Sequence, residues 1–110
     1  MSHFNKIMVG ERFAEQHSFF ANYLYKKHTP ISEMKLRTCN AMVLEYRSAK
    51  GYTVYLLKSY DTIVAMISEL GNGIDFLRYV YGYTATSAQH IRKFFDDYCK
   101  ENARIFVYKP

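Results

Sequence analysis

The sequence contains no tryptophan, two cysteines, two prolines and five glycines. Cys39 and Cys99 fall outside any metal-binding or redox spacing, so we expect reduced thiols in an intracellular protein. No apolar run approaches the ~20 residues of a membrane span. The first residues also lack the apolar core of a signal peptide. We therefore expect a cytoplasmic protein that does not insert into a membrane.

Aromatic side chains are abundant by contrast, with 11 tyrosines and 8 phenylalanines among 110 residues. A chain of this length forms one domain, residues 1–110, because half of it could not build an adequate core. Each buried tyrosine hydroxyl needs a hydrogen-bond partner, and a small domain cannot supply one for all of them. Several tyrosines should therefore lie at the surface or in an interface.

The net charge of +5 is unevenly distributed along the chain. Residues 26–58 carry seven basic and two acidic side chains, whereas residues 59–101 carry four basic and six acidic ones. This asymmetry favours an anionic partner, either nucleic acid or an acidic protein face. The alternative is a solvated surface that serves solubility alone.

The spacing of apolar residues predicts a first helix over residues 10–28. Phe13, His17, Phe20 and Leu24 would form its buried face, which Phe19 and Tyr23 would extend sideways. Thr29-Pro30 ends the helix, because the residue before proline avoids helical geometry. Residues 31–38 fit either a short helix or an extended link.

The periodicity then changes toward two, which predicts antiparallel strands over 41–47, 52–59, 62–68 and 74–81. Gly71-Asn72-Gly73 is the strongest turn signal between them. A second helix should run to about Asn102, with a cap from Thr84, Thr86 or Ser87. Its buried stripe would comprise Ala88, Ile91, Phe94 or Phe95, and Tyr98, and residues 105–108 would form a short final strand. The predicted fold is α+β, a four-stranded antiparallel meander with an N-terminal and a C-terminal helix packed on one face.

Nothing in the sequence predicts catalysis or metal binding. Ser87 and His90 could pair as a nucleophile and base, but no Gly-x-Ser-x-Gly elbow surrounds Ser87, and a serine at a helix start is usually a cap. Metal-binding spacings are absent, and the adjacent Asp96 and Asp97 point in different directions on a helix. We therefore expect a protein that is not an enzyme and that binds no cofactor or metal.

Aromatic and basic residues near the predicted central strands are the better candidates. Tyr79 and Tyr81 would share one sheet face. Such a surface could stack single-stranded bases, form a protein-binding hot spot, or simply cover the sheet beneath a helix. No ribonucleoprotein-type signature supports the first alternative. The candidate binding residues are Lys50, Tyr52, Tyr55, Lys58, Arg78, Tyr79, Tyr81 and His90.

Residues 57–94 resemble small proteins of phages and mobile elements in Gram-positive bacteria. The pattern L-x-S-Y-x-T-x-V-A begins at Leu57, and Y-x-x-T-[ST]-x-x-H-I-x-x-F begins at Tyr83. The resemblance covers a third to a half of the chain and excludes the first helix and the basic segment up to about Lys50. In the shared part, Ser59, Tyr60 and Thr62 have the character of a turn. A helix cap does not require His90, so we expect it to connect the helix start to this turn.

The resemblance implies a non-catalytic binder or inhibitor in the cytoplasm of a bacterial host, since small phage proteins often act stoichiometrically on host machinery. Anti-CRISPR inhibitors, which bind a nuclease or its guide complex, are one such class. The implied partner is a host protein or nucleoprotein complex such as a CRISPR nuclease. The alternative is a small basic nucleic-acid-binding protein, which would use the same residues together with Lys26, Lys27, Lys35 and Arg37.

Overall fold

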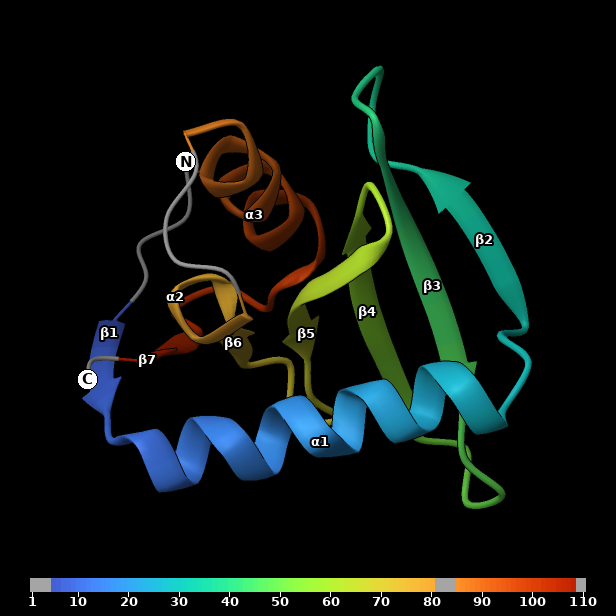
Figure 1. Cartoon of the computed structure of the whole chain (residues 1–110). Coiled ribbons are helices and arrows are strands. Elements are labelled where there is room, and N and C mark those ends of the chain that lie inside the picture. Colours follow the sequence, from blue (N-terminus) through green and yellow to red (C-terminus); the bar gives the residue numbers. More distant parts are fainter. Residues whose placement is uncertain (1–4, 81–84, 109–110) are drawn as a thin grey trace.

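The computed structural model describes residues 5–80 and 85–108 of the chain, which form an α+β fold. Its centre is a seven-stranded sheet with the strand order β1-β7-β6-β5-β4-β3-β2 (Figure 1). The strands are β1 (Asn5–Val9), β2 (Ser32–Lys35), β3 (Ala41–Arg47), β4 (Thr53–Ser59), β5 (Thr62–Ile67), β6 (Gly73–Asp75) and β7 (Arg104–Tyr108). The helices are α1 (Glu11–Lys27), α2 (Leu77–Val80) and α3 (Ala85–Tyr98).

The sheet is mixed, so the predicted four-stranded antiparallel meander is wrong, although the α+β class is confirmed. Strands β3, β4, β5 and β6 do pair in antiparallel succession. However, β2 adds an antiparallel strand at one edge, while β7 and β1 add two parallel strands at the other. The parallel strands β1 and β7 come from the two ends of the sequence, and local patterns do not show such pairing.

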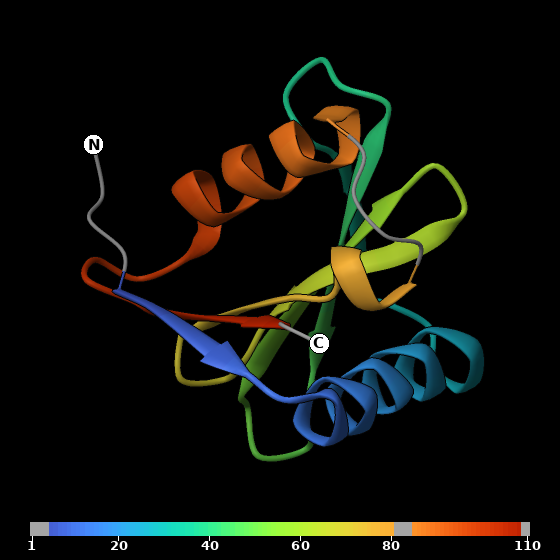
Figure 2. The same ribbon diagram turned by 60° about the vertical axis from the view of Figure 1, so that its left-hand side comes forward.

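The two long helices cover opposite faces of the sheet, with α1 on one side and α3 on the other (Figure 2). The prediction of both helices on one face is therefore wrong. Consecutive residues of β3 show the reason: Val43 packs in the core that contains Phe94 of α3, and Leu44 in the core that contains Ala21 of α1. Strands whose side chains are buried on both faces need cover on both sides.

Helix α1 packs on the sheet through its small residues. Its buried side chains are Ala14, Ser18 and Ala21, which let the helix backbone approach the strands closely. The predicted buried stripe is therefore rotated from the true one, and the prediction is wrong for Phe20 in particular. Phe20 is 50% exposed, and its neighbour Phe19 is 73% exposed.

The predicted strand 74–81 ends early, at Asp75. The Asp75 carboxylate accepts a hydrogen bond from the Leu77 N–H at 2.9 Å, and the N–H groups of Tyr79 and Val80 then bond to Phe76 O. A short polar side chain that binds nearby backbone competes with strand pairing in this way and favours a turn. Tyr79 therefore lies on α2 and not on a sheet face, and Tyr81 lies outside the described residues.

Candidate functional site

Three polar side chains form a buried chain of hydrogen bonds between β4 and α3. The hydroxyl of Ser59 lies 3.1 Å from the hydroxyl of Ser87 and 3.0 Å from Nδ1 of His90. Ser87 lies within the first turn of α3, and the predicted alternative cap Thr84 lies outside the described residues. The expected role of His90 is thus confirmed in its geometry, because this residue joins the start of α3 to the end of β4.

The same cluster is poorly placed for nucleophilic catalysis. Ser59 has 0% exposure and His90 has 5%, so a substrate carbonyl could not reach the hydroxyl. Burial, with a further contribution from Lys93, lowers the pKa of His90. A neutral imidazole can accept a hydrogen bond from the Ser59 hydroxyl at Nδ1 or donate one to it, depending on its tautomer, whereas a protonated ring can only donate.

Acid should weaken the fold through this histidine. Because the folded-state pKa is lowered, the unfolded chain binds more protons as pH falls below about 6.5, so stability is complete above that pH and declines below it. Burial also lowers the pKa of His17. Each histidine can add a slope of at most about 1.4 kcal/mol per pH unit.

Urea unfolding between pH 5 and pH 8 would measure this effect. We expect His90→Asn to reduce the loss of stability in acid, and His17→Gln to reduce it separately. An unchanged pH profile in His90→Asn would contradict the role given to this imidazole.

The structure does not gather the predicted binding residues on one surface. Lys50 and Tyr52 are exposed at the β3–β4 turn. Tyr55 is half-buried on the α3 face, with its ring centroid 5.0 Å from that of Tyr98. Lys58 lies on the α1 face, where its Nζ is 5.5 Å from the ring centroid of Tyr25. Tyr55 and Lys58 therefore cannot contact the same flat partner.

The remaining predicted residues lie elsewhere. Arg78 is exposed on α2, and the ring of the half-buried Tyr79 lies 5.5 Å from that of Tyr108. Tyr81 is outside the described residues, and His90 is buried. The geometry therefore supports neither a single aromatic row on the sheet nor a direct contact of His90 with a partner.

A surface that the sequence reasoning missed lies on the outer side of α1. Phe19, Phe20 and Tyr23 are 73%, 50% and 49% exposed, and we call these three residues the aromatic face. Phe19 and Tyr23 are one helical turn apart and thus adjacent on the helix surface. Three large rings this exposed on one helix segment are unusual in a small domain, where such patches commonly mark interaction sites.

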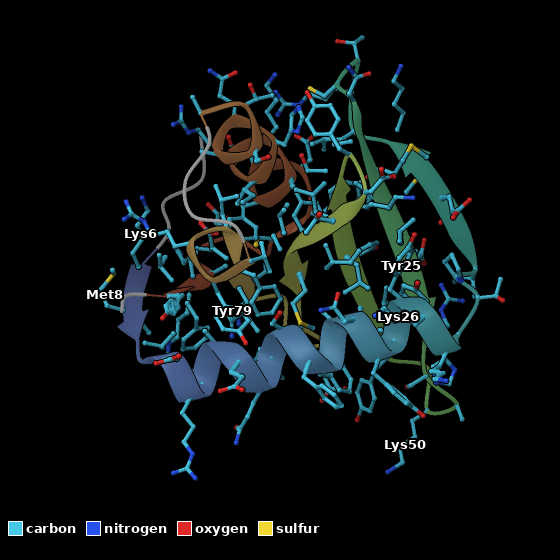
Figure 3. The ribbon with its side chains drawn as sticks, in the orientation of Figure 1. Lys6, Met8, Tyr25, Lys26, Lys50 and Tyr79 are labelled. Atoms are coloured by element: carbon cyan, nitrogen blue, oxygen red, sulfur yellow. The ribbon has the colours of Figure 1, made fainter. Side chains whose placement is uncertain are left out.

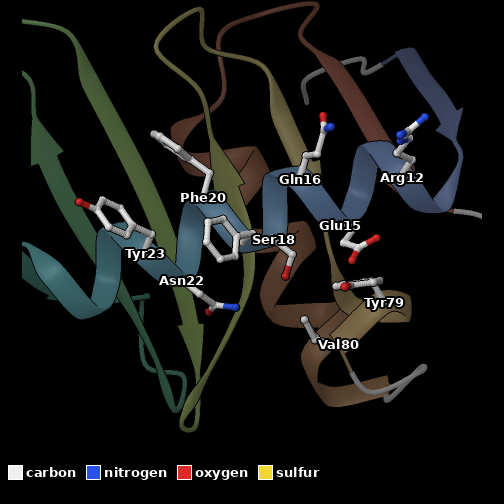
Figure 4. A pocket seen from close by; sticks show the side chains of 10 residues that line it. Arg12, Glu15, Gln16, Ser18, Phe20, Asn22, Tyr23, Tyr79 and Val80 are labelled. Carbon is white, nitrogen blue, oxygen red and sulfur yellow. The ribbon is translucent and has the colours of Figure 1, made fainter.

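A groove between α1 and α2 is lined in part by this face, since Phe19, Phe20 and Tyr23 all border it. Figure 4 shows Glu15, Ser18 and Asn22 on the side of α1 that is turned toward Tyr79 and Val80 of α2, whereas Phe20 projects from the other side. The aromatic face thus forms part of a concave surface that also carries polar side chains. A groove lined by aromatic rings can engage a partner by shape as well as by apolar contact.

Charged side chains flank the aromatic face. Arg12 is exposed about two turns before Phe19. Lys26 and Lys27 are exposed in the last turn of α1, where Figure 3 labels Lys26. The centre of the face carries no charge. The sequence did contain a signal for this arrangement, because Ala14, Ser18 and Ala21 form a second stripe with a 4-3 spacing. The larger apolar residues nevertheless predict a different buried face, because the buried face of a helix is usually its most hydrophobic one.

The remaining candidates for chemistry have structural roles. Asp97 accepts two hydrogen bonds from Arg37, at 2.9 and 2.7 Å, and this contact lowers the pKa of Asp97. Both cysteines are free thiols, and burial raises the pKa of Cys99 to about 12. In the described part of the chain, no group of three potential ligand side chains could hold a metal ion. No helix there has the length and apolar character needed to cross a membrane.

These features define an α+β domain whose most distinctive described surface is an aromatic helix face. Comparison with known proteins adds no relative to this description. No protein-family model matches the chain, and neither the curated proteins nor the solved structures contain a significant match.

Proposed function

We propose that this protein is a non-catalytic binding protein whose aromatic face, Phe19, Phe20 and Tyr23, docks onto a host protein and occludes part of its surface. The observation that carries the proposal is the exposure of these three rings on a helix that already has a buried face. Apolar rings exposed without a folding role are costly for solubility, so a surface that retains them is best explained by a partner.

The composition of the face favours a protein as the partner. Aromatic side chains dominate the hot spots of protein interfaces, where they fill desolvated pockets, and charged residues are depleted at the centre of such interfaces. The uncharged centre of the aromatic face has this character. Lys26 and Lys27 at its border suit a partner with acidic residues around an apolar pocket, because complementary charge speeds association.

The resemblance of residues 57–94 to small phage and mobile-element proteins supports an inhibitor as the form of this activity. An inhibitor of this kind acts by binding alone, as an anti-CRISPR protein does on a CRISPR nuclease. Such a mechanism requires a stable scaffold and a projecting surface. The sheet, with a hydrophobic core on each of its faces, would provide the scaffold, and α1 would provide the projecting surface.

Binding to single-stranded nucleic acid is the second candidate. The observation that favours it is the position of Lys26 and Lys27 one helical turn after Tyr23, since bases stack on aromatic rings while lysines neutralise phosphates. The salt dependence of the affinity distinguishes binding to a protein from binding to nucleic acid. Affinity for a phosphate backbone falls steeply with salt, whereas an interface with an aromatic centre loses much less.

The test is affinity capture from a bacterial host lysate with the tagged protein and its Phe19→Ala/Tyr23→Ala variant. Each hot-spot ring contributes about 2 kcal/mol or more to binding, so we expect recovery of the partner by the double variant to fall by about 100-fold or more. Nuclease treatment of the lysate should leave the recovery by the wild type unchanged.

Leu70→Ala is the matched control, because Leu70 is a large apolar residue that is 69% exposed but lies away from α1. It lies in the turn after β5, where Gly71 O accepts a hydrogen bond from the Lys100 N–H. This variant should recover the partner as well as the wild type does. Equal recovery by the double variant would refute the aromatic face as the docking surface. Recovery of nucleic acid alone, with all protein lost after nuclease treatment, would refute the protein partner.

A further inference from the structure

Strand β2 forms an open edge of the sheet. It stands last in the strand order, beside β3, and Figure 1 shows it at the outer margin of the sheet. Its residues Glu33, Met34 and Lys35 are exposed, and Met34 is 39% exposed although its side chain is apolar. The unpaired N–H and C=O groups of such an edge can pair with a further strand.

The main-chain groups of Glu33 and Lys35 point to this open edge. The Leu36 N–H donates to Ala41 O at 2.9 Å, in continuation of the register of β2 on β3. Alternate residues of an antiparallel strand bond to the same neighbour. Met34 and Leu36 therefore bond to β3, and Glu33 and Lys35 direct their N–H and C=O groups away from it. Within the described part of the chain, the structure gives these outward groups no hydrogen-bond partner.

The side chains of Glu33 and Lys35 carry opposite charges and share one face of the sheet, because residues two apart on a strand do so. Glu33 pairs with Leu44, which belongs to the core under α1, so this is the α1 face. Neither side chain forms an ion pair or a side-chain hydrogen bond with a described residue. Edge strands are often protected from pairing by lysines, whereas β2 has one charge of each sign.

These features make β2 complementary to a second copy of itself. When two β2 strands pair antiparallel around a two-fold axis at Met34, Glu33 of each copy stands opposite Lys35 of the other. The outward main-chain groups of each such pair then exchange both of their hydrogen bonds. The opposite charges meet on the α1 face, while Met34 contacts Met34 of the second copy across the axis, on the α3 face.

The charges also select this register. A shift by two residues would place either Glu33 opposite Glu33 or Lys35 opposite Lys35 of the second copy, and like charges directly opposite each other are destabilising. The open edge at β1 lacks such a pattern. Lys6 is the one charged residue of that strand, so β1 offers no opposite charge to pair with it.

We propose that β2 is a dimerisation edge, at which a second copy of this chain continues the sheet across a two-fold axis. Such an interface is isologous, because the same strand contributes from both copies. A strand of this length buries little surface, so the dimer is weak and forms at high protein concentration. The edge is separate from the aromatic face of α1 and does not depend on the function proposed for it.

Sedimentation equilibrium of the intact chain at concentrations up to about 1 mM would measure this association. Glu33→Lys and Lys35→Glu each replace the opposite-charge pairs across the axis by like-charge pairs. Each variant alone should therefore dimerise about tenfold or more weakly than the wild type. An equimolar mixture of the two variants should restore association to about the wild-type level, because every pair between unlike variants is again opposite in charge. A purely structural role of the two residues would not produce this recovery.

Lys6→Glu is the matched control for Lys35→Glu, because it makes the same charge change on the other edge strand. It should leave the dimer unchanged. Hydrogen exchange monitored by NMR gives a second measurement. The N–H groups of Glu33 and Lys35 should exchange more slowly as the protein concentration rises, since they become paired in the dimer.

Several outcomes would overturn the proposal. These are the absence of a dimer at about 1 mM, a mixture of the two charge variants that associates no better than either alone, and equal weakening by Lys6→Glu. A dimer that persists in both charge variants but is lost in Phe19→Ala/Tyr23→Ala would place the contact at the aromatic face and refute the β2 edge.

Discussion

Replacing Phe94 with alanine should lower the free energy of unfolding by about 3–5 kcal/mol, whereas Phe19→Ala should change it by about 0.5 kcal/mol or less. Both residues are phenylalanines on long helices, but Phe94 is 0% exposed and Phe19 is 73% exposed. The ring of Phe94 lies 5.7 Å from that of Phe95 and 5.6 Å from that of Tyr98, between centroids. Its removal leaves a cavity in the core that joins α3 to the sheet.

Removal of the Phe19 ring leaves no cavity, and the higher helix propensity of alanine offsets the small loss of contact. Because the chain lacks tryptophan, urea unfolding followed by far-ultraviolet circular dichroism is the suitable measurement. A loss of several kcal/mol in Phe19→Ala would mean that this ring supports the fold. The aromatic face would then not be a free surface for a partner.

Replacing Gly73 with alanine should cost about 1–3 kcal/mol. A Cβ at this position would lie 2.7 Å from Cδ1 of Ile105 and 2.7 Å from Cε1 of Phe95. Both side chains are buried and cannot move into solvent, so the core between β6, β7 and α3 must expand. Gly73 is needed for this close approach, whereas the neighbouring Gly71 adopts the positive φ of +83° that the turn requires.

Gly10→Ala is the matched control for Gly73→Ala. A Cβ at Gly10 would meet nothing within 4 Å, and its φ of −77° is ordinary for any residue. Chemical denaturation should therefore show about 0.5 kcal/mol of change or less for Gly10→Ala. Equal midpoints for the two variants would show that α3 does not pack on Gly73 as closely as the structure indicates.

Local patterns predicted most of the individual elements. The helix over residues 10–28, the strands β3, β4 and β5, and the final strand at β7 all occur near their expected positions. In α3 the expected stripe is confirmed, since Ile91, Phe94 and Phe95 are buried. These elements have strong periodicity and turn residues between them, so the chain's own local preferences determine where they form.

The elements that the sequence did not predict each depend on a tertiary contact or a side-chain hydrogen bond that no local pattern reveals. Strand β1 pairs with β7, from the far end of the chain. Strand β6 stops because the Asp75 side chain accepts a hydrogen bond from the Leu77 N–H, although residues 74–81 have the composition of a strand. The expected aromatic row on one sheet face does not form, because Tyr79 lies on α2 and because Tyr55 and Lys58 lie on opposite faces of the sheet.

The sequence by itself determined the α+β class, the order of most helices and strands, and the expectation that aromatic rings would remain at the surface. Those properties follow from periodicity, turn chemistry and composition. Only the tertiary structure decided which rings these are. Helix α1 could bury either its aromatic stripe or its small-residue stripe, and close approach to the sheet favoured Ala14, Ser18 and Ala21. Because this choice depends on how α1 packs against β5 and β7, it placed Phe19, Phe20 and Tyr23 outside.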